Sequence, residues 1–83
     1  MQASFLFIKR GDRYIKVPVE DILYVSAAGS YLQLHTAYEA FSLSQNLSQF
    51  QRHNPISSLV RVHRSYMVNV SQIHSFDHTF VYI

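Results

Sequence analysis

Apolar and polar residues alternate along the first half of the chain, which is the pattern of strands. Turn-forming residues divide this half at Gly11-Asp12, Pro18, Ala28-Gly29-Ser30 and Tyr38-Glu39. The runs between them are FLFIK, YIKVP, ILYVSA, YLQLHT and AFSL. Because alternate side chains of a strand point to opposite faces of a sheet, residues 4–43 are predicted to form roughly five short strands, with a hairpin turn at Gly11-Asp12.

One stretch has the spacing of a helix instead. Ser42 and Gln45 stand three residues apart, as in a capping box, and Asn54-Pro55 ends the stretch. Its apolar residues follow at i, i+4 and i+7: Leu43, Leu47 and Phe50. We therefore predict one short helix at roughly residues 43–52. Its helix propensity is ordinary, so it should depend on docking Leu47 and Phe50 onto a sheet.

Beyond the helix the chain returns to runs rich in strand-forming residues, LVRVH, RSYMVNVSQIHSF and TFVYI. In the first of them, Val60 and Val62 are predicted to point to one face, and Arg61 and His63 to the other. The last run, Phe80 to Ile83, has no evident partner strand and is predicted to be an open edge. The pattern as a whole predicts a mainly β domain with one helix.

Composition narrows the class of protein. The 83 residues are enough for one domain, and an apolar fraction of 48% with six Tyr and six Phe is too high for a disordered tail. Cysteine is absent, which excludes disulfides and thiolate metal sites. No signal peptide and no apolar run of about 18 residues is present, so we expect a cytoplasmic protein that does not contact a membrane.

The charges are unevenly distributed. Residues 1–39 carry four basic and four acidic side chains, whereas residues 40–76 carry Arg52, Arg61, Arg64 and three histidines but no acidic residue. A half of the chain that carries only positive charges suits a polyanionic partner such as nucleic acid. Chance in a short chain explains the distribution equally well, so composition alone leaves both interpretations open.

The most informative segment is basic and lies between two predicted strands. Arg61, His63 and Arg64 stand beside the hydroxyl of Ser65. Arginine and small hydroxyl donors suit phosphates, and arginine can also hold O6 and N7 of guanine together. A β-turn can enter a groove of DNA as a helix does. The alternative is that Arg61 and Arg64 are solvated, with a core of Tyr66, Val68 and Val70.

The sequence resembles the LytTR family of DNA-binding domains, the output domains of many bacterial response regulators. The matching stretches are EDILYV (20–25), GSYLQL (29–34), SLSQNLSQF (42–50) and VRVHRSYMVN (60–69), followed by Ile73. The resemblance implies an elongated set of small antiparallel sheets with one short helix. It also implies that loops enter successive major grooves of DNA, as in a transcription regulator of a two-component system.

The resemblance also assigns residues. It implies that Ser30 and Tyr31 lie at the DNA, that Arg64 reads base edges, and that His63 and Ser65 lie near the backbone of the DNA. Arg61, on the strand leading in, is expected to contact a phosphate or to be exposed. Asn69 and Asp21 are expected to be structural, because their side chains can bond backbone where the chain bends.

Other expectations follow from the same resemblance. The resemblance implies double-stranded DNA as the partner, a homodimer on a repeated site, and control by a receiver domain or a sensor kinase pathway. Family members usually continue past the last strand found here into a further turn and strand that touches DNA. The chain is therefore expected to be one LytTR-like domain, residues 1–83, that lacks this terminal strand.

Three other functions would make different demands on these residues. A hydrolytic enzyme would need a catalytic triad such as Ser65, His63 and Asp77. A small β-domain has little room for a substrate pocket of about 300 Å³, so no catalytic activity is expected. His74 and His78 alone fall short of a zinc site, and no cofactor is expected. The serious alternative is a module that binds a protein strand at its open edge. DNA binding should weaken steeply with salt, and strand addition should not.

Overall fold

The computed structural model describes residues 5–73, 75–76 and 81–82. The elements along this part of the chain are β1 (Phe5–Arg10), β2 (Arg13–Pro18), the 3-10 turn η1 (Val19–Asp21), β3 (Ile22–Ala28), β4 (Tyr31–Thr36), β5 (Ala40–Leu43), α1 (Leu47–His53), β6 (Leu59–His63), β7 (Tyr66–Asn69), the 3-10 turn η2 (Val70–Gln72), β8 (Ser75–Phe76) and β9 (Val81–Tyr82). The molecule measures 42 × 27 × 26 Å. The predicted class, an elongated and mainly β fold with small antiparallel sheets and one short helix, is confirmed.

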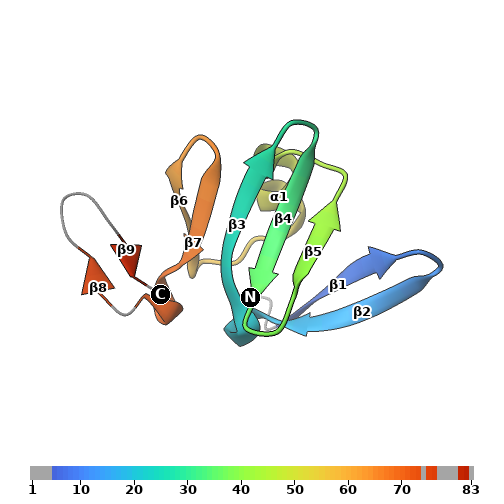
Figure 1. Cartoon of the computed structure of the whole chain (residues 1–83), viewed down its shortest axis with the longest axis horizontal. Coiled ribbons are helices and arrows are strands. Elements are labelled where there is room, and N and C mark those ends of the chain that lie inside the picture. Colours follow the sequence, from blue (N-terminus) through green and yellow to red (C-terminus); the bar gives the residue numbers. More distant parts are fainter. Residues whose placement is uncertain (1–4, 74, 77–80, 83) are drawn as a thin grey trace.

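The central sheet has five strands in the order β5-β4-β3-β7-β6, and α1 lies across one of its faces (Figure 1). All of its pairings are antiparallel. The middle strand, β3, pairs with its sequence neighbour β4 on one side and with the distant β7 on the other. Strands β1 and β2 form a separate hairpin beside β5 (Figure 1). Among the described residues, no helix has the length and apolar character needed to cross a membrane.

The core lies between the central sheet, α1 and the β1–β2 hairpin. Each of these elements buries one apolar face, as the alternation predicted. The buried cluster consists of Leu6, Ile8, Val17, Ile22, Val25, Leu32, Leu34, Phe41, Leu43, Leu47, Phe50, Ile56, Leu59 and Met67. Leu47 and Phe50 are the two core residues of α1, which confirms that the helix docks through them.

The helix begins later than predicted. Asn46, not Ser42, is its N-cap: its Oδ1 accepts from the Gln49 N–H (2.8 Å), and Gln49 Oε1 accepts from the Asn46 N–H (3.0 Å). Leu43 lies at the end of β5 and is buried there. The prediction was wrong because an apolar residue at a strand end also fits the i, i+4 spacing of a helix. The end at Asn54 was predicted correctly.

Strand β6 departs from the predicted alternation. Arg61 pairs with Met67, but His63 pairs with Tyr66, so Val62 is an extra residue at a β-bulge. Val60 and His63 therefore share one face of the sheet, and Arg61 faces the other with Met67. Val60 and Val62 are both exposed, and so are Tyr66 and Val70, which the alternative interpretation had placed in the core.

Asn69 joins the two 3-10 turns at one end of the sheet. Its side chain is fully buried, and its Nδ2 donates to the carbonyls of Val19 (3.0 Å) and Ile22 (2.9 Å). Its Oδ1 accepts from both the N–H (3.2 Å) and the hydroxyl (2.7 Å) of Ser71. The structural role predicted for Asn69 is confirmed. Asp21 contributes to this end of the sheet through its backbone, because its carbonyl accepts a hydrogen bond from the Ala37 N–H (3.2 Å).

The C-terminal pairing corrects one expectation. Val81 and Tyr82 pair with Phe76 and Ser75, so this part of the run from Phe80 to Ile83 has a partner strand on one side. Phe80 and Ile83 themselves lie outside the described residues, as do Asp77 and His78.

Candidate nucleic-acid interface

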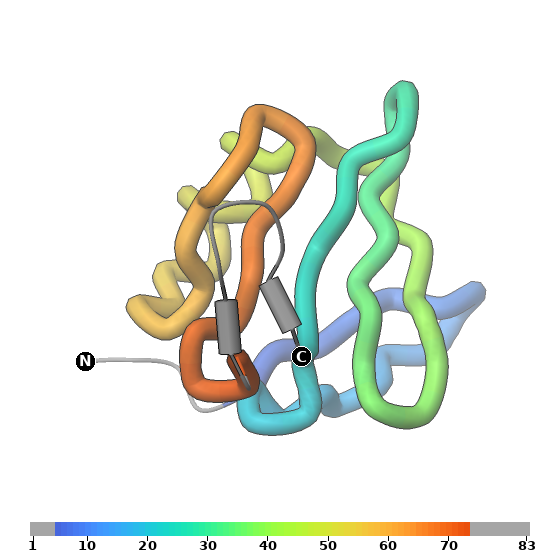
Figure 2. The backbone as a smooth tube through the Cα atoms, turned by 60° about the vertical axis from the view of Figure 1, so that its left-hand side comes forward, coloured from blue at the N-terminus to red at the C-terminus, as the bar shows by residue number. Residues whose placement is uncertain are grey.

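Two hairpin turns lie together at one end of the central sheet. One joins β3 to β4 through Gly29 and Ser30, and the other joins β6 to β7 through Arg64 and Ser65. Both turns are at the top of the sheet in Figure 1 and again in Figure 2. The β6–β7 turn is bonded to β3 just before the other turn, because the Ala27 N–H donates to the Ser65 carbonyl (2.8 Å).

The β3–β4 turn has a glycine where its backbone needs one. Ala28 pairs with Tyr31, so Gly29 and Ser30 are the two central residues, and Gly29 has φ +62°. A positive φ at the first central position is the feature of a type II′ turn, which matches the twist of the flanking strands. The first hairpin is built alike, with Gly11 at φ +63°.

The β6–β7 turn carries the basic residues. Arg64 and His63 are exposed and Ser65 is half-buried. The His63 ring takes part in the turn, since its Nδ1 accepts from the Ser65 N–H (3.0 Å). The Tyr66 ring lies 5.5 Å from the His63 ring. Within the described residues, the Arg64 side chain forms no hydrogen bond or ion pair, so its guanidinium is available to a ligand.

Arg61 is placed differently from the other predicted residues. It lies on the α1 side of β6, where its Nη1 donates to Ser48 Oγ (3.1 Å) and its Nη2 donates to the Arg64 carbonyl (2.7 Å). Its guanidinium therefore links the first turn of α1 to the basic turn. The structure thus gathers all six predicted residues, Ser30, Tyr31, Arg61, His63, Arg64 and Ser65, at one end of the sheet, with Arg61 tied to the protein.

Two residues of this region were missed from the sequence. Ser48 has no signal of its own, because its contact with Arg61 depends on how α1 packs. Tyr66 is 45% exposed beside the turn. Its position next to the apolar Met67 in a predicted strand was a sequence signal for it, because neighbouring strand residues face opposite sides.

The open face of the sheet, opposite α1, carries a second histidine. The His35 ring stacks on Tyr24 with a centroid distance of 4.1 Å, and its Nε2 lies 3.1 Å from Ser26 Oγ. Burial lowers the pKa of His35 from its ordinary value of 6.5. The lowered pKa favours the neutral form of the His35 ring.

Acidic residues lie at the opposite end of the sheet from the two turns. Glu20 and Asp21 are in η1, just before β3, and Glu39 follows β4. Glu39 forms an ion pair with Arg10. The stretches that meet at the turns, residues 24–32 and 60–68, contain no acidic side chain. The turn end is therefore the basic end of the central sheet.

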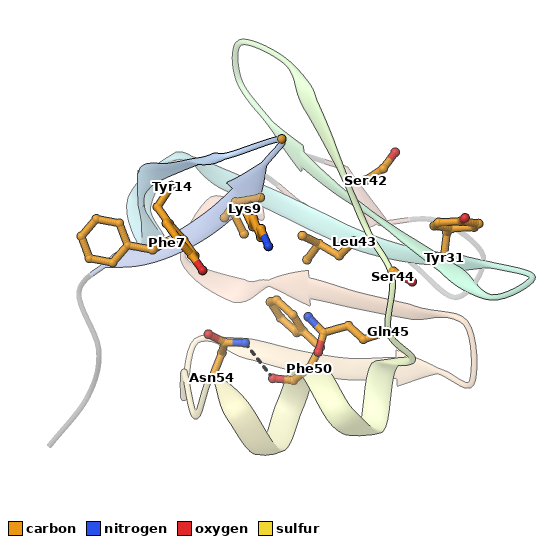
Figure 3. Close-up of a pocket in the computed structure, with 12 residues that line it drawn as sticks. Phe7, Lys9, Tyr14, Tyr31, Ser42, Leu43, Ser44, Gln45, Phe50 and Asn54 are labelled. Carbon is orange, nitrogen blue, oxygen red and sulfur yellow. Dashed lines mark hydrogen bonds between the residues drawn. The ribbon is translucent and has the colours of Figure 1, made fainter.

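The surface is more hollowed than expected. A groove of about 470 Å³ lies between the β1–β2 hairpin and α1, with Phe7 and Tyr14 on one side, Leu43 and Phe50 at its floor and Tyr31 at its far end (Figure 3). The expectation of little room for a pocket was wrong, because the hairpin stands away from the sheet.

The groove is open and does not bring a catalytic set of residues together. The His63 ring accepts from the backbone N–H of Ser65, not from its hydroxyl. Among the described residues, no three His, Asp or Glu side chains are grouped to hold a metal ion.

Comparison with known proteins identifies the family. The family model of the LytTr DNA-binding domain matches residues 12–82. The transcriptional regulatory protein YpdB of Escherichia coli is 30% identical over 68 residues, which cover 82% of this chain and 28% of that protein. The sensory transduction protein LytR of Staphylococcus saprophyticus is 27% identical over 80 residues, covering 96% of this chain and 32% of that protein. The chain thus spans less than a third of the length of these relatives.

A solved structure agrees with the sequence comparisons. The LytTr DNA-binding domain of a putative methyl-accepting/DNA response regulator from Bacillus cereus matches with a TM-score of 0.72 and 27% identity. The match covers 88% of this chain and 67% of that chain. The chain belongs to the LytTR family of DNA-binding domains.

Proposed function

We propose that this domain binds specific sites in duplex DNA by inserting its β3–β4 and β6–β7 turns into successive major grooves. The observation that carries the proposal is that both turns lie at the basic end of the sheet, where the Ala27–Ser65 hydrogen bond of 2.8 Å holds the β6–β7 turn against β3. Rigid strands on either side hold each turn, which suits readout of a groove by a β-element.

Each residue has a proposed role. Arg64 reads a guanine, because its exposed guanidinium has no partner among the described residues and its planar fork fits O6 and N7. His63 and Ser65 lie near the DNA backbone, and Ser30 and Tyr31 contact the neighbouring groove. Tyr31 is 54% exposed, so its ring is accessible to DNA.

The wider role is proposed from the relatives, which are named transcriptional regulatory and sensory transduction proteins. We propose that the domain is the cytoplasmic output part of a response regulator, controlled by a receiver domain and a sensor kinase. It would bind as a dimer on a repeated site and would act by binding, not by catalysis.

The test begins with selection of bound duplexes from a random pool, which returns the preferred site. Arg64→Ala should then cost about 1–3 kcal/mol of binding free energy on that site and flatten the preference at one base pair. Arg64→Lys should not restore it fully, because an ammonium cannot reproduce the planar fork. Affinities for the site and its single-base variants are the measurement.

Arg13→Ala is the matched control. Arg13 has the same charge but lies in the β1–β2 hairpin, so this variant should keep the base preference. Equal loss on specific and nonspecific DNA in Arg64→Ala would make Arg64 a backbone contact and shift base reading to Ser30 and Tyr31. Affinity that does not fall with salt would instead favour strand addition to a protein partner, because each phosphate contact adds a log–log slope of about −0.9.

A further inference from the structure

The β6–β7 turn lacks the positive-φ glycine that the β1–β2 and β3–β4 turns share. Gly11 and Gly29 have φ of +63° and +62°, whereas neither Arg64 nor Ser65 has a positive φ. Two-residue hairpin turns without positive φ do not match the twist of the strands and splay them apart. The bulge at Val62 takes up part of this mismatch. The turn therefore needs further contacts to hold its shape.

Arg61 supplies one such contact and anchors it to α1. Opposite Met67 it lies on the α1 side of the sheet, and from there its Nη2 donates to the Arg64 carbonyl (2.7 Å) while its Nη1 donates to Ser48 Oγ (3.1 Å). We call this arrangement the Arg61 bridge. A planar guanidinium can hold two acceptors in fixed directions, which a lysine cannot do.

We propose that Arg61 is a positioning residue that sets the orientation of Arg64 through the Arg61 bridge, and that it is not a phosphate contact. The inference rests on the proposed reading of a base by Arg64. The acceptor of the shorter bond is the backbone carbonyl of Arg64 itself. A displacement of Arg61 therefore moves the backbone to which the Arg64 side chain is attached. Two of the five N–H donors of the Arg61 guanidinium have protein acceptors, and these two bonds fix the guanidinium between α1 and the turn.

The energetic consequence is small for folding and larger for recognition. All three residues of the bridge are exposed, and hydrogen bonds of this kind contribute little net stability. A bidentate contact with guanine depends on direction, so loss of the bridge should appear as loss of base discrimination. It should not appear as loss of attraction to phosphate.

The experiment measures affinity for the selected site and for its single-base variants across a series of salt concentrations. In Arg61→Ala, discrimination at the base pair read by Arg64 should fall about 5-fold, the equivalent of one hydrogen bond of roughly 1 kcal/mol. The salt slope should stay at its wild-type value. Ser48→Ala should shift discrimination in the same direction by less, and Ser48→Thr, which keeps the hydroxyl, should preserve it.

Two further variants test the mechanism. Arg61→Lys should rescue only part of the discrimination, because one ammonium cannot span both acceptors. Adding Arg61→Ala to Arg64→Ala should cause no further loss of discrimination, since Arg61 acts through Arg64. Independent losses in the double variant, or full rescue by lysine, would contradict the bridge.

A readout without DNA separates this inference from the proposed function. In the free protein, amide relaxation should show greater motion at Arg64 and Ser65 in Arg61→Ala than in the wild type. Unchanged relaxation overturns the bridge, and a salt slope smaller by about 0.9 makes Arg61 a phosphate contact. If Arg64→Ala keeps discrimination while relaxation does change, the assignment of Arg64 fails and the bridge is a contact that only shapes the turn.

Discussion

At the scale of single residues, two groups of side chains act at opposite ends of the central sheet. One group holds the basic turn, and the other holds the rest of the sheet. Asn69 is the main example of the second kind, because one buried amide satisfies two carbonyls and a serine that are far apart in the chain. Buried polar groups left without partners are costly. Substitution of Asn69 should therefore lower the stability of the fold and leave DNA recognition unchanged.

Asn69→Ala should lower the free energy of unfolding by about 1–3 kcal/mol, because the Ile22 carbonyl loses the amide donor and the Val19 carbonyl keeps only the Ile22 N–H. Asn69→Asp should cost at least as much near pH 7, since a carboxylate cannot donate. The measurement is the urea midpoint at constant m. Val70→Ala, at an exposed neighbour, should stay within about 0.5 kcal/mol. Equal effects at both positions would contradict the role of Asn69.

At the scale of elements, α1 is short and depends on its cap. It has seven residues, and isolated helices of this length are unstable in water. The capping box of Asn46 and Gln49 satisfies N–H groups that the helix cannot pair itself. Packing of Leu47 and Phe50 supplies the rest.

Asn46→Ala should reduce stability by about 0.5–2 kcal/mol through loss of the cap. Ser42→Ala is the informative comparison, since Ser42 was the N-cap predicted from the sequence and lies in β5. It should cost clearly less, because Ser42 is exposed and its hydroxyl accepts, among the described side chains, only from Gln33 Nε2 (2.9 Å). Thermal or urea unfolding of the two variants decides between the two helix starts, and the reverse order would favour the earlier one.

The glycine turns offer a second comparison between elements. Gly29→Ala and Gly11→Ala should each cost about 1–2 kcal/mol of stability, because both positions have positive φ. An added Cβ would meet nothing within 4 Å, so the whole cost comes from the backbone conformation. Only Gly29→Ala should also weaken binding to the selected DNA site. Unfolding and affinity measured on both variants test this, and equal binding by the two would remove the β3–β4 turn from the interface.

At the scale of the whole molecule, the local parts of the fold could be predicted from the sequence and the assembled site could not. Alternation and glycine turns are local signals, and they located the strands up to Leu43. The approach of Ser30 to Arg64 depends on β3 pairing with β7, which no local pattern reveals. The bridge from Arg61 to Ser48 depends further on how α1 packs against the face of the sheet that carries Arg61 and Met67. The predicted DNA contacts came from family resemblance, since the residue types alone also fitted a solvated surface.

The separation of charge along the central sheet affects events before any contact forms. With Arg64 at one end and Glu20 and Asp21 at the other, this part of the molecule carries an electric dipole roughly along its strands. In the field of a polyanion, such a dipole experiences a torque that turns the positive end forward. A larger share of collisions with DNA would then arrive with the β6–β7 turn leading. Orientation during diffusion is what limits most association rates, so the placement of acidic residues far from the interface contributes to how quickly the site is found.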